Sequence, residues 1–254
     1  MSTLADFSIT RKWPATRPDL LQLYSLPTPN GVKVSILLEE LGMPYEVHKI
    51  SFESNDQTSP EFVGTFPNNK IPAIIDPNGP GGQAIALFES GAIMVYLAEK
   101  TGMFLPQDPV KRYETLQWLM FQMGGIGPMF GQVGFFNIFA GKDFEDKRPL
   151  TRYVDESKRL LTVLNKHLAG KEWVAGDTYT IADIAVWPWY GALVQNKVYS
   201  AAEFLSVHEY PNLIRWTEEI AARPAVIKGQ KVNRTWGEEA DQVPERHQAS
   251  DLDK

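Results

Sequence analysis

The spacing of apolar residues predicts a strand, a helix and a second strand early in the chain. Residues 20–24 (Leu-Leu-Gln-Leu-Tyr) have the composition of a strand. After a turn at residues 28–31, four aliphatic residues recur at i, i+3, i+4 and i+7, as on one face of a helix: Val34, Leu37, Leu38 and Leu41. Gly42 is expected to end this helix, and residues 45–50 to form the next strand. Together these segments predict a βαβ unit.

The following apolar segments predict a β-hairpin and a helix. Residues 72–75 and 84–88 flank residues 76–82, a loop dense in Asp, Asn, Gly and Pro that favours turns. Ser90 is expected to cap a helix with Ile93, Tyr96 and Leu97 on one face. The order β-α-β, then β-β-α, is that of a thioredoxin-like domain.

Helical periodicity takes over beyond a segment at residues 101–109 that contains a glycine and two prolines. Residues 181–189 are apolar nearly all round, as expected of a helix in the centre of a bundle, and Pro188 is expected to bend or end it. The predicted fold class is therefore α/β plus all-α. We expect an extended arm over residues 1–19, a thioredoxin-like domain over 20–102, an all-helical domain over 110–228, and a polar tail over 229–254. That tail is expected either to wrap the body or to be disordered.

Composition and charge exclude several kinds of partner. The 254 residues carry a net charge of −6, whereas nucleic-acid binding needs a basic surface. Apolar runs fall short of the ~18 to 20 residues of a membrane span, and the first residues lack the pattern of a secretory leader. We therefore expect a cytoplasmic protein with neither a nucleic-acid nor a membrane partner.

Cysteine is absent, which removes disulfides, thiolate ligands and a protein thiol nucleophile. Any sulfur chemistry must then use the sulfur of a ligand. The four histidines lie far apart in the sequence without metal-site spacing, so no metal is predicted: His48, His167, His208 and His247.

Two short motifs together indicate a site for an amino-acid head group. In Ile71-Pro72 the proline has no N–H and can adopt a cis bond, so the residue before it can present its backbone to a ligand. Glu89 and Ser90, at the start of a predicted helix, offer an acceptor for an ammonium group and donors for a carboxylate. A plain helix cap is the alternative for Glu89 and Ser90.

These motifs, taken in order, resemble the glutathione transferase superfamily. The matching segments are Asn69-Lys70-Ile71-Pro72-Ala73, Phe88-Glu89-Ser90-Gly91-Ala92-Ile93, and the capping box Thr180-Ile181-Ala182-Asp183 with Trp187-Pro188-Trp189. Three more segments resemble the bacterial nu class of disulfide-bond oxidoreductases, which is related to the yeast nitrogen-catabolite prion regulator: Thr28-Pro29-Asn30-Gly31, residues 97–102 and residues 245–251. The likeness runs from about residue 18 to the C-terminus. It implies a thioredoxin-like domain followed by a glutathione-transferase-type helical bundle, in a homodimer.

The resemblance also implies glutathione as co-substrate, with one or two molecules per subunit. Ile71 would pair its backbone with the cysteinyl part, and a cis Pro72 would set the angle. Glu89 and Ser90 would hold the γ-glutamyl ammonium and carboxylate. The other implied glutathione-binding residues are Asn30, Gln57 and Arg152; the last two are otherwise a solvated loop residue and a surface charge.

Bound glutathione must be activated, because a free thiol with a pKa near ~8.5 is only a few per cent thiolate at neutral pH. Thr28 and Asn30 are the catalytic candidates, since a hydroxyl and an amide can donate to sulfur and the helix starting near Gly31 adds its dipole. The alternative is that both residues only cap the helix and form the turn. Without a cysteine, disulfide reduction would need two glutathiones, one to attack and one to resolve the mixed disulfide.

The resulting hypothesis is glutathione-dependent reduction of small or peptide disulfides. A conventional transferase or peroxidase, acting on electrophiles or hydroperoxides, is the alternative among enzymes. A non-catalytic glutathione-binding regulator is the alternative from another class, weakened because no Asn/Gln-rich segment precedes the fold. The glycine-rich residues 124–131, with Phe135, Phe136 and Phe139, either line a co-substrate pocket or allow close helix packing.

Overall fold

The first apolar segments form the predicted βαβ unit. In the computed structural model, which describes residues 2–197, 199–239 and 242–253, β1 (Leu21–Ser25) and β2 (Tyr45–Lys49) pair in parallel. Helix α1 (Gly31–Glu40) connects them and buries each of its first eight residues. Gly42 follows with a φ of +59°, a conformation that glycine adopts without a Cβ penalty, so the helix ends where predicted.

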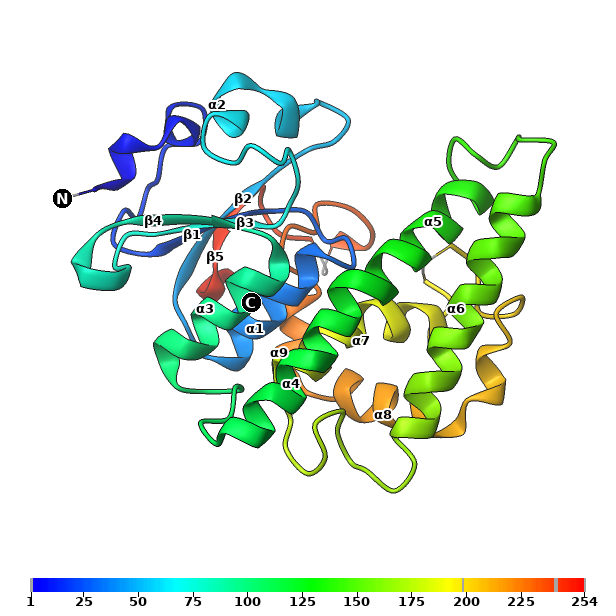
Figure 1. Cartoon of the computed structure of the whole chain (residues 1–254). Helices are drawn as coiled ribbons and strands as arrows, with labels where there is room; N and C mark the ends of the chain where they lie inside the picture. Colours follow the sequence, from blue (N-terminus) through cyan, green and yellow to red (C-terminus); the bar gives the residue numbers. More distant parts are fainter. Residues whose placement is uncertain (1, 198, 240–241, 254) are drawn as a thin grey trace. The chain divides into compact units, whose positions relative to one another are not determined.

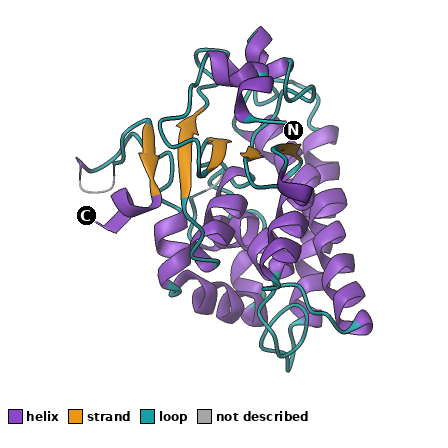
Figure 2. Ribbon diagram, turned by 90° about the vertical axis from the view of Figure 1, so that its left-hand side faces the viewer, coloured by secondary structure: helices purple, strands orange, loops and turns teal. Residues whose placement is uncertain are grey.

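The predicted hairpin is also present and extends the sheet. Strands β3 (Ala73–Asp76) and β4 (Ile85–Phe88) pair antiparallel, and β3 pairs antiparallel with β1. The strand order is β4-β3-β1-β2-β5, where β5 is Arg246–Gln248. The strands are drawn in orange in Figure 2. Helices α1 and α3 (Ser90–Thr101) lie along one face of this sheet, and α2 (Pro60–Val63) lies on the other side (Figure 1). The thioredoxin-like prediction is therefore confirmed.

The N-terminal segment differs from the extended arm that the sequence suggested. Two 3-10 turns, Leu4–Asp6 and Ser8–Arg11, occupy its first part. Ile9 is fully buried in a cluster with Tyr24, Phe62 and Phe66, and the backbone N–H of Ile9 donates to the Thr65 hydroxyl over 3.1 Å. An apolar anchor with a backbone hydrogen bond holds this segment against the domain.

Residues of the expected tail and of the last expected helix belong to the first compact unit, which comprises Met1–Leu97 and Pro224–Lys254. Helix α9 (Pro224–Gly229) packs on α1 so closely that a Cβ on Gly229 would lie 2.6 Å from the Cα of Ile36. The Ser35 hydroxyl donates to the Gly229 carbonyl over 2.7 Å. Strand β5 then pairs antiparallel with β2, so this segment takes the wrapped form of the two alternatives.

The second unit, Ala98–Arg223, is helical. Its elements are α4 (Pro109–Phe121), a π-helical turn (Gln122–Ile126), α5 (Gly127–Asn137), α6 (Arg148–His167), α7 (Ile181–Val194), a 3-10 turn (Val207–Glu209) and α8 (Pro211–Ala221). Helix α7 is buried nearly all round, as predicted. It does not end at Pro188, because the helix continues to Val194 with the proline inside it. Among the described residues, no helix is long and apolar enough to cross a membrane.

The predicted capping box opens α7. The Thr180 hydroxyl accepts from the backbone N–H of Ala182 over 3.3 Å, and the Asp183 carboxylate accepts from the N–H of Thr180 over 3.0 Å. Asp183 also accepts from the Val174 N–H over 2.8 Å and from the Trp216 indole over 2.9 Å. One buried carboxylate thus connects three parts of this unit.

The glycine-rich stretch is closely packed at Gly127, where a Cβ would lie 3.0 Å from the side-chain nitrogen of Gln122. A Cβ on Gly125 or Gly131 would make ordinary contacts, at 3.5 Å from Leu160 and 3.9 Å from Trp189. Just beyond, a Cβ on Gly134 would lie 2.3 Å from the ring of Tyr199. The contacts of Gly127 and Gly134 favour the packing interpretation at these two positions of α5.

Candidate functional site

The register of the sheet brings three of the predicted motifs to one edge. Ala73 of β3 pairs with Tyr24 of β1 and with Phe88 of β4. Ile71-Pro72 therefore lies just before β3, Glu89-Ser90 just after β4, and the Thr28–Gly31 turn shortly after β1. Adjacent antiparallel strands place these ends side by side.

The turn after β1 is tightly built around Thr28. Its hydroxyl oxygen accepts from the Gly31 N–H over 3.2 Å, and its carbonyl accepts from the Val32 N–H over 3.0 Å. Asn30 is the N-cap residue of α1, directly before its first helical residue. A Cβ on Gly31 would lie 1.9 Å from the Leu26 carbonyl oxygen, so the chain can pass here only with glycine. Thr28 thus forms the turn, as in the structural alternative, and its O–H proton can still be donated to a ligand.

Lys33, a residue that the sequence patterns did not single out, joins two of the motifs. Its side chain is buried, with 1% of its surface exposed. Its Nζ donates to the Asn30 Oδ1 over 2.9 Å and to the Ser90 Oγ over 3.4 Å. Burial lowers the pKa of Lys33 to about 7, although the Glu89 carboxylate opposes this shift. No sequence pattern marks this lysine, because its burial follows from neighbours that are buried in the structure.

The peptide bond between Ile71 and Pro72 is cis, as the resemblance implied. Both residues are buried, with Ile71 packed in the cluster that contains Phe62 and Phe66. Within the described part of the chain, the backbone N–H and C=O of Ile71 make no hydrogen bond. A backbone N–H and C=O in this position are well suited to pair with an extended peptide.

Helix α3 begins at Ser90, one residue earlier than a Ser90 cap would require. Glu89 precedes it with a φ of 70°, in the left-handed region where residues other than glycine are uncommon. The Glu89 side chain is exposed and its Oε1 accepts from the Asn68 amide over 2.8 Å, whereas Ser90 is buried. A carboxylate, a hydroxyl and the first N–H groups of a helix therefore meet at one point.

Gln57 and Arg152 lie outside this group of contacts. Gln57 is half-buried in a 3-10 turn, Asp56–Thr58, and its Oε1 is buried without a hydrogen-bond partner among the described residues. A ligand or water would satisfy such an oxygen. Arg152 belongs to α6 of the helical unit, where its exposed guanidinium lies 4.0 Å from Glu156. Both assignments to glutathione stay predictions.

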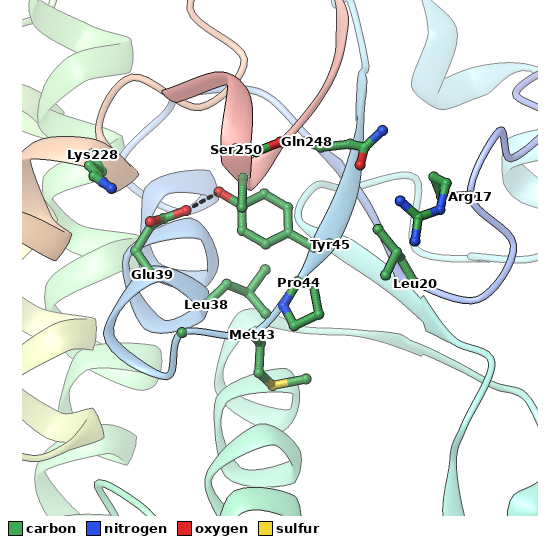
Figure 3. A pocket seen from close by; sticks show the side chains of 12 residues that line it. Arg17, Leu20, Leu38, Glu39, Met43, Pro44, Tyr45, Lys228, Gln248 and Ser250 are labelled. Carbon is green, nitrogen blue, oxygen red and sulfur yellow. Dashed lines mark hydrogen bonds between the residues drawn. The ribbon is translucent and has the colours of Figure 1, made fainter. Parts of the chain in front are cut away.

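A separate hollow of about 330 Å³ lies near the other end of α1 (Figure 3). Leu38, Glu39 and Tyr45 line it together with Lys228 and Ser250. The Tyr45 hydroxyl donates to Glu39 over 2.5 Å. This hollow does not contain any of the predicted glutathione residues. Over the residues that the structure describes, no three metal-binding side chains gather in one place.

Comparison with known proteins agrees with this arrangement of elements. The family model of the glutathione S-transferase N-terminal domain matches residues 20–99, and that of the C-terminal domain matches residues 149–219. The disulfide-bond oxidoreductase YghU of Escherichia coli K12 is 48% identical over 239 residues, covering 92% of this chain and 82% of the relative.

The chain is also similar to solved structures of glutathione transferases. A glutathione transferase from Pseudomonas putida, crystallised with one glutathione disulfide bound per subunit, is 61% identical, with a TM-score of 0.88 and coverage of 91% of this chain and 99% of its own. A family member from Pseudomonas fluorescens with two glutathiones bound is 62% identical, with a TM-score of 0.86 and coverage of 88% and 98%. The present chain belongs to the glutathione transferase superfamily.

Proposed function

We propose that this protein binds glutathione at the sheet edge described above and uses its thiol to reduce disulfides of small molecules or peptides. The observation that carries the proposal is that three ligand-binding motifs converge on one edge in a chain without cysteine. A similar protein is named a disulfide-bond oxidoreductase, and similar structures hold glutathione or its disulfide. The protein supplies the site, and glutathione supplies the sulfur.

The reaction is balanced with two glutathiones. The thiolate of the first attacks one sulfur of the substrate disulfide, and the other substrate sulfur leaves as a thiolate that takes up a proton. The second glutathione, as its thiolate, attacks the glutathione sulfur of the mixed disulfide. The products are two substrate thiols and glutathione disulfide. A site that holds two glutathiones, or glutathione disulfide, suits the second step.

Thr28 and Asn30 are proposed to stabilise the attacking thiolate. The Asn30 Oδ1 accepts from Lys33, so the opposite end of the amide, Nδ2, is the end that can donate to sulfur. The Thr28 hydroxyl already accepts a backbone N–H and has one proton to donate. Each unit by which these donors lower the thiol pKa corresponds to about 1.4 kcal/mol of preference for the thiolate.

The remaining contacts follow from the chemistry of the tripeptide. Glu89 would accept from the γ-glutamyl ammonium, while Ser90 and the first N–H groups of α3 would donate to its carboxylate. Ile71, held by the cis Pro72, would pair its backbone with the cysteinyl residue. Gln57 and Arg152 complete the proposed set.

We also propose a homodimer in the cytoplasm. Helix α4 exposes Val110, Tyr113 and Met120, with exposed fractions of 68%, 70% and 56%, and their spacing places them on one side of the helix. An apolar stripe of this kind suits a second copy of the chain. The cytoplasm maintains the reduced glutathione that the reaction consumes.

The test compares two activities in the wild type and in Asn30→Ala. We expect glutathione-dependent reduction of 2-hydroxyethyl disulfide to exceed conjugation of an aromatic halide, and the variant to lose at least about tenfold in reduction, one pKa unit of thiolate stabilisation. Ser54→Ala, at an exposed loop position, is the matched control. Strong conjugation with negligible disulfide reduction would support the conventional transferase instead, and tight glutathione binding without either activity would support a regulator.

A further inference from the structure

Lys33 lies between the two ends of the proposed glutathione site. Its Nζ donates to the Asn30 Oδ1, on the turn assigned to the sulfur, and to the Ser90 Oγ, assigned to the γ-glutamyl carboxylate. The side chain is 1% exposed, so water does not screen it as it would a surface lysine. One buried amine thus touches a residue at each end of the ligand.

We propose that Lys33 is a positioning residue for the thiolate of glutathione, acting as a positive charge one amide group away from the sulfur and gaining a proton as the thiol loses one. The inference rests on the proposed function. It assigns a role to a residue that contacts the reacting sulfur only through Asn30.

The charge would act through the amide and through space. An ammonium that donates to Oδ1 fixes the orientation of the Asn30 amide and polarises it, which strengthens Nδ2–H as a donor. In a buried site, the charge of the Lys33 ammonium changes the energy of the nearby thiolate by more than it would in water. A thiol pKa lowered by roughly one unit is the expected size of the effect.

The proton that the glutathione thiol loses goes to Lys33 or to water. Burial lowers the pKa of Lys33 to about 7 in the ligand-free protein, with Glu89 as the charged group that opposes the shift. The neutral amine is therefore a populated form near neutral pH. Binding brings a carboxylate to Ser90 and a thiolate to Asn30, which favour the ammonium form of Lys33, while the γ-glutamyl ammonium that pairs with Glu89 opposes it. Where Lys33 is neutral, the S–H bond is broken and an N–H bond is formed on Lys33; where Lys33 is already an ammonium, the thiol proton passes to water. No oxidation or reduction takes place in this step.

Two measurements on the full chain test this inference. The first is the net proton exchange on binding glutathione, from calorimetry in buffers of different ionisation enthalpy, with S-methylglutathione, which has no thiol, as the reference ligand. Relative to that reference, Lys33→Arg should release more protons than wild type at pH 7, because an arginine is already charged and cannot take up the proton that the thiol loses. The second is the pKa of bound glutathione, from the ultraviolet absorbance of the thiolate.

The thiol pKa should rise by about one unit in Lys33→Met and return towards the wild-type value in Lys33→Arg, which restores the charge. A purely structural lysine would not give this pattern. Equal proton release from wild type and Lys33→Arg, or Lys33→Met with an unchanged thiol pKa, would overturn the inference. If Lys33→Met does not fold, the comparison of wild type with Lys33→Arg still decides. If wild-type protein leaves the glutathione pKa at its solution value, the proposed function itself fails.

Discussion

Replacing Asp183 by alanine should destabilise the helical unit by about 4 kcal/mol. Its carboxylate accepts from the N–H groups of Val174 and Thr180, from the Thr180 hydroxyl and from the indole of Trp216, all of them buried. Each donor left without a partner costs about 1 to 3 kcal/mol, and water entering the alanine cavity would recover part of the sum.

Asp183→Asn separates the two carboxylate oxygens. The Val174 N–H and the Trp216 indole both donate to Oδ1, which the amide keeps, whereas Oδ2 becomes an amide nitrogen that faces the Thr180 N–H. Only the Thr180 N–H is then left without an acceptor, because the Thr180 hydroxyl, which donates to Oδ2 in the wild type, can accept from the new amide nitrogen instead. The expected cost is about 2 kcal/mol.

Urea unfolding followed by tryptophan fluorescence measures both variants, since five of the seven tryptophans lie in the second unit. The exposed Asp177, whose side chain is 82% exposed and 3.6 Å from Lys111, gives a matched control, Asp177→Ala, expected within about 0.5 kcal/mol of wild type. Asp183→Ala within about 1 kcal/mol of wild type would refute the hydrogen-bond argument. Equal losses for alanine and asparagine would show that charge, and not the number of bonds, is what matters.

Three further outcomes are expected. Ile9→Ala should cost about 3 kcal/mol in urea unfolding, because the side chain is fully buried; a loss below about 1 kcal/mol would mean that the N-terminal segment detaches readily. Burial lowers the pKa of His48 to about 4, so as the pH falls the unfolded chain takes up this proton before the folded protein does. The free energy of unfolding should therefore fall by about 3 kcal/mol from pH 6.5 to pH 4, and His48→Gln should flatten this slope. Gly31→Ala, whose Cβ would lie 1.9 Å from the Leu26 carbonyl, should abolish glutathione binding in calorimetry, whereas Gly124→Ala, with open space, should leave it intact.

The sequence predicted the elements that carry a regular pattern. Helix α1 and the hairpin followed from periodicity and turn residues, and the capping box of α7 followed from the spacing of Thr180 and Asp183. Pro188 removes one hydrogen bond from α7, but burial on all sides holds the helix together past it. Packing outweighed the local propensity there.

Short or isolated features escaped prediction for physical reasons. Strand β5 has three residues, too few to show an alternating pattern, and Ile9 is an isolated apolar residue in a polar segment. Lys33 would ordinarily be placed on the solvent side of an amphipathic helix. Its burial depends on Ser90, which the sheet register brings to α1 from 57 residues away.

Strand β5 also affects the order in which the protein can be made and folded. The helical unit is a continuous stretch of chain, whereas the sheet of the first unit needs residues from both sides of it. During synthesis, β2 cannot pair with β5 until Arg246–Gln248 has left the ribosome, whereas the helical unit can fold before that point. An unpaired strand edge is prone to pair with other chains. The nascent chain is therefore most exposed to aggregation, and most dependent on chaperones, in the interval between these two events.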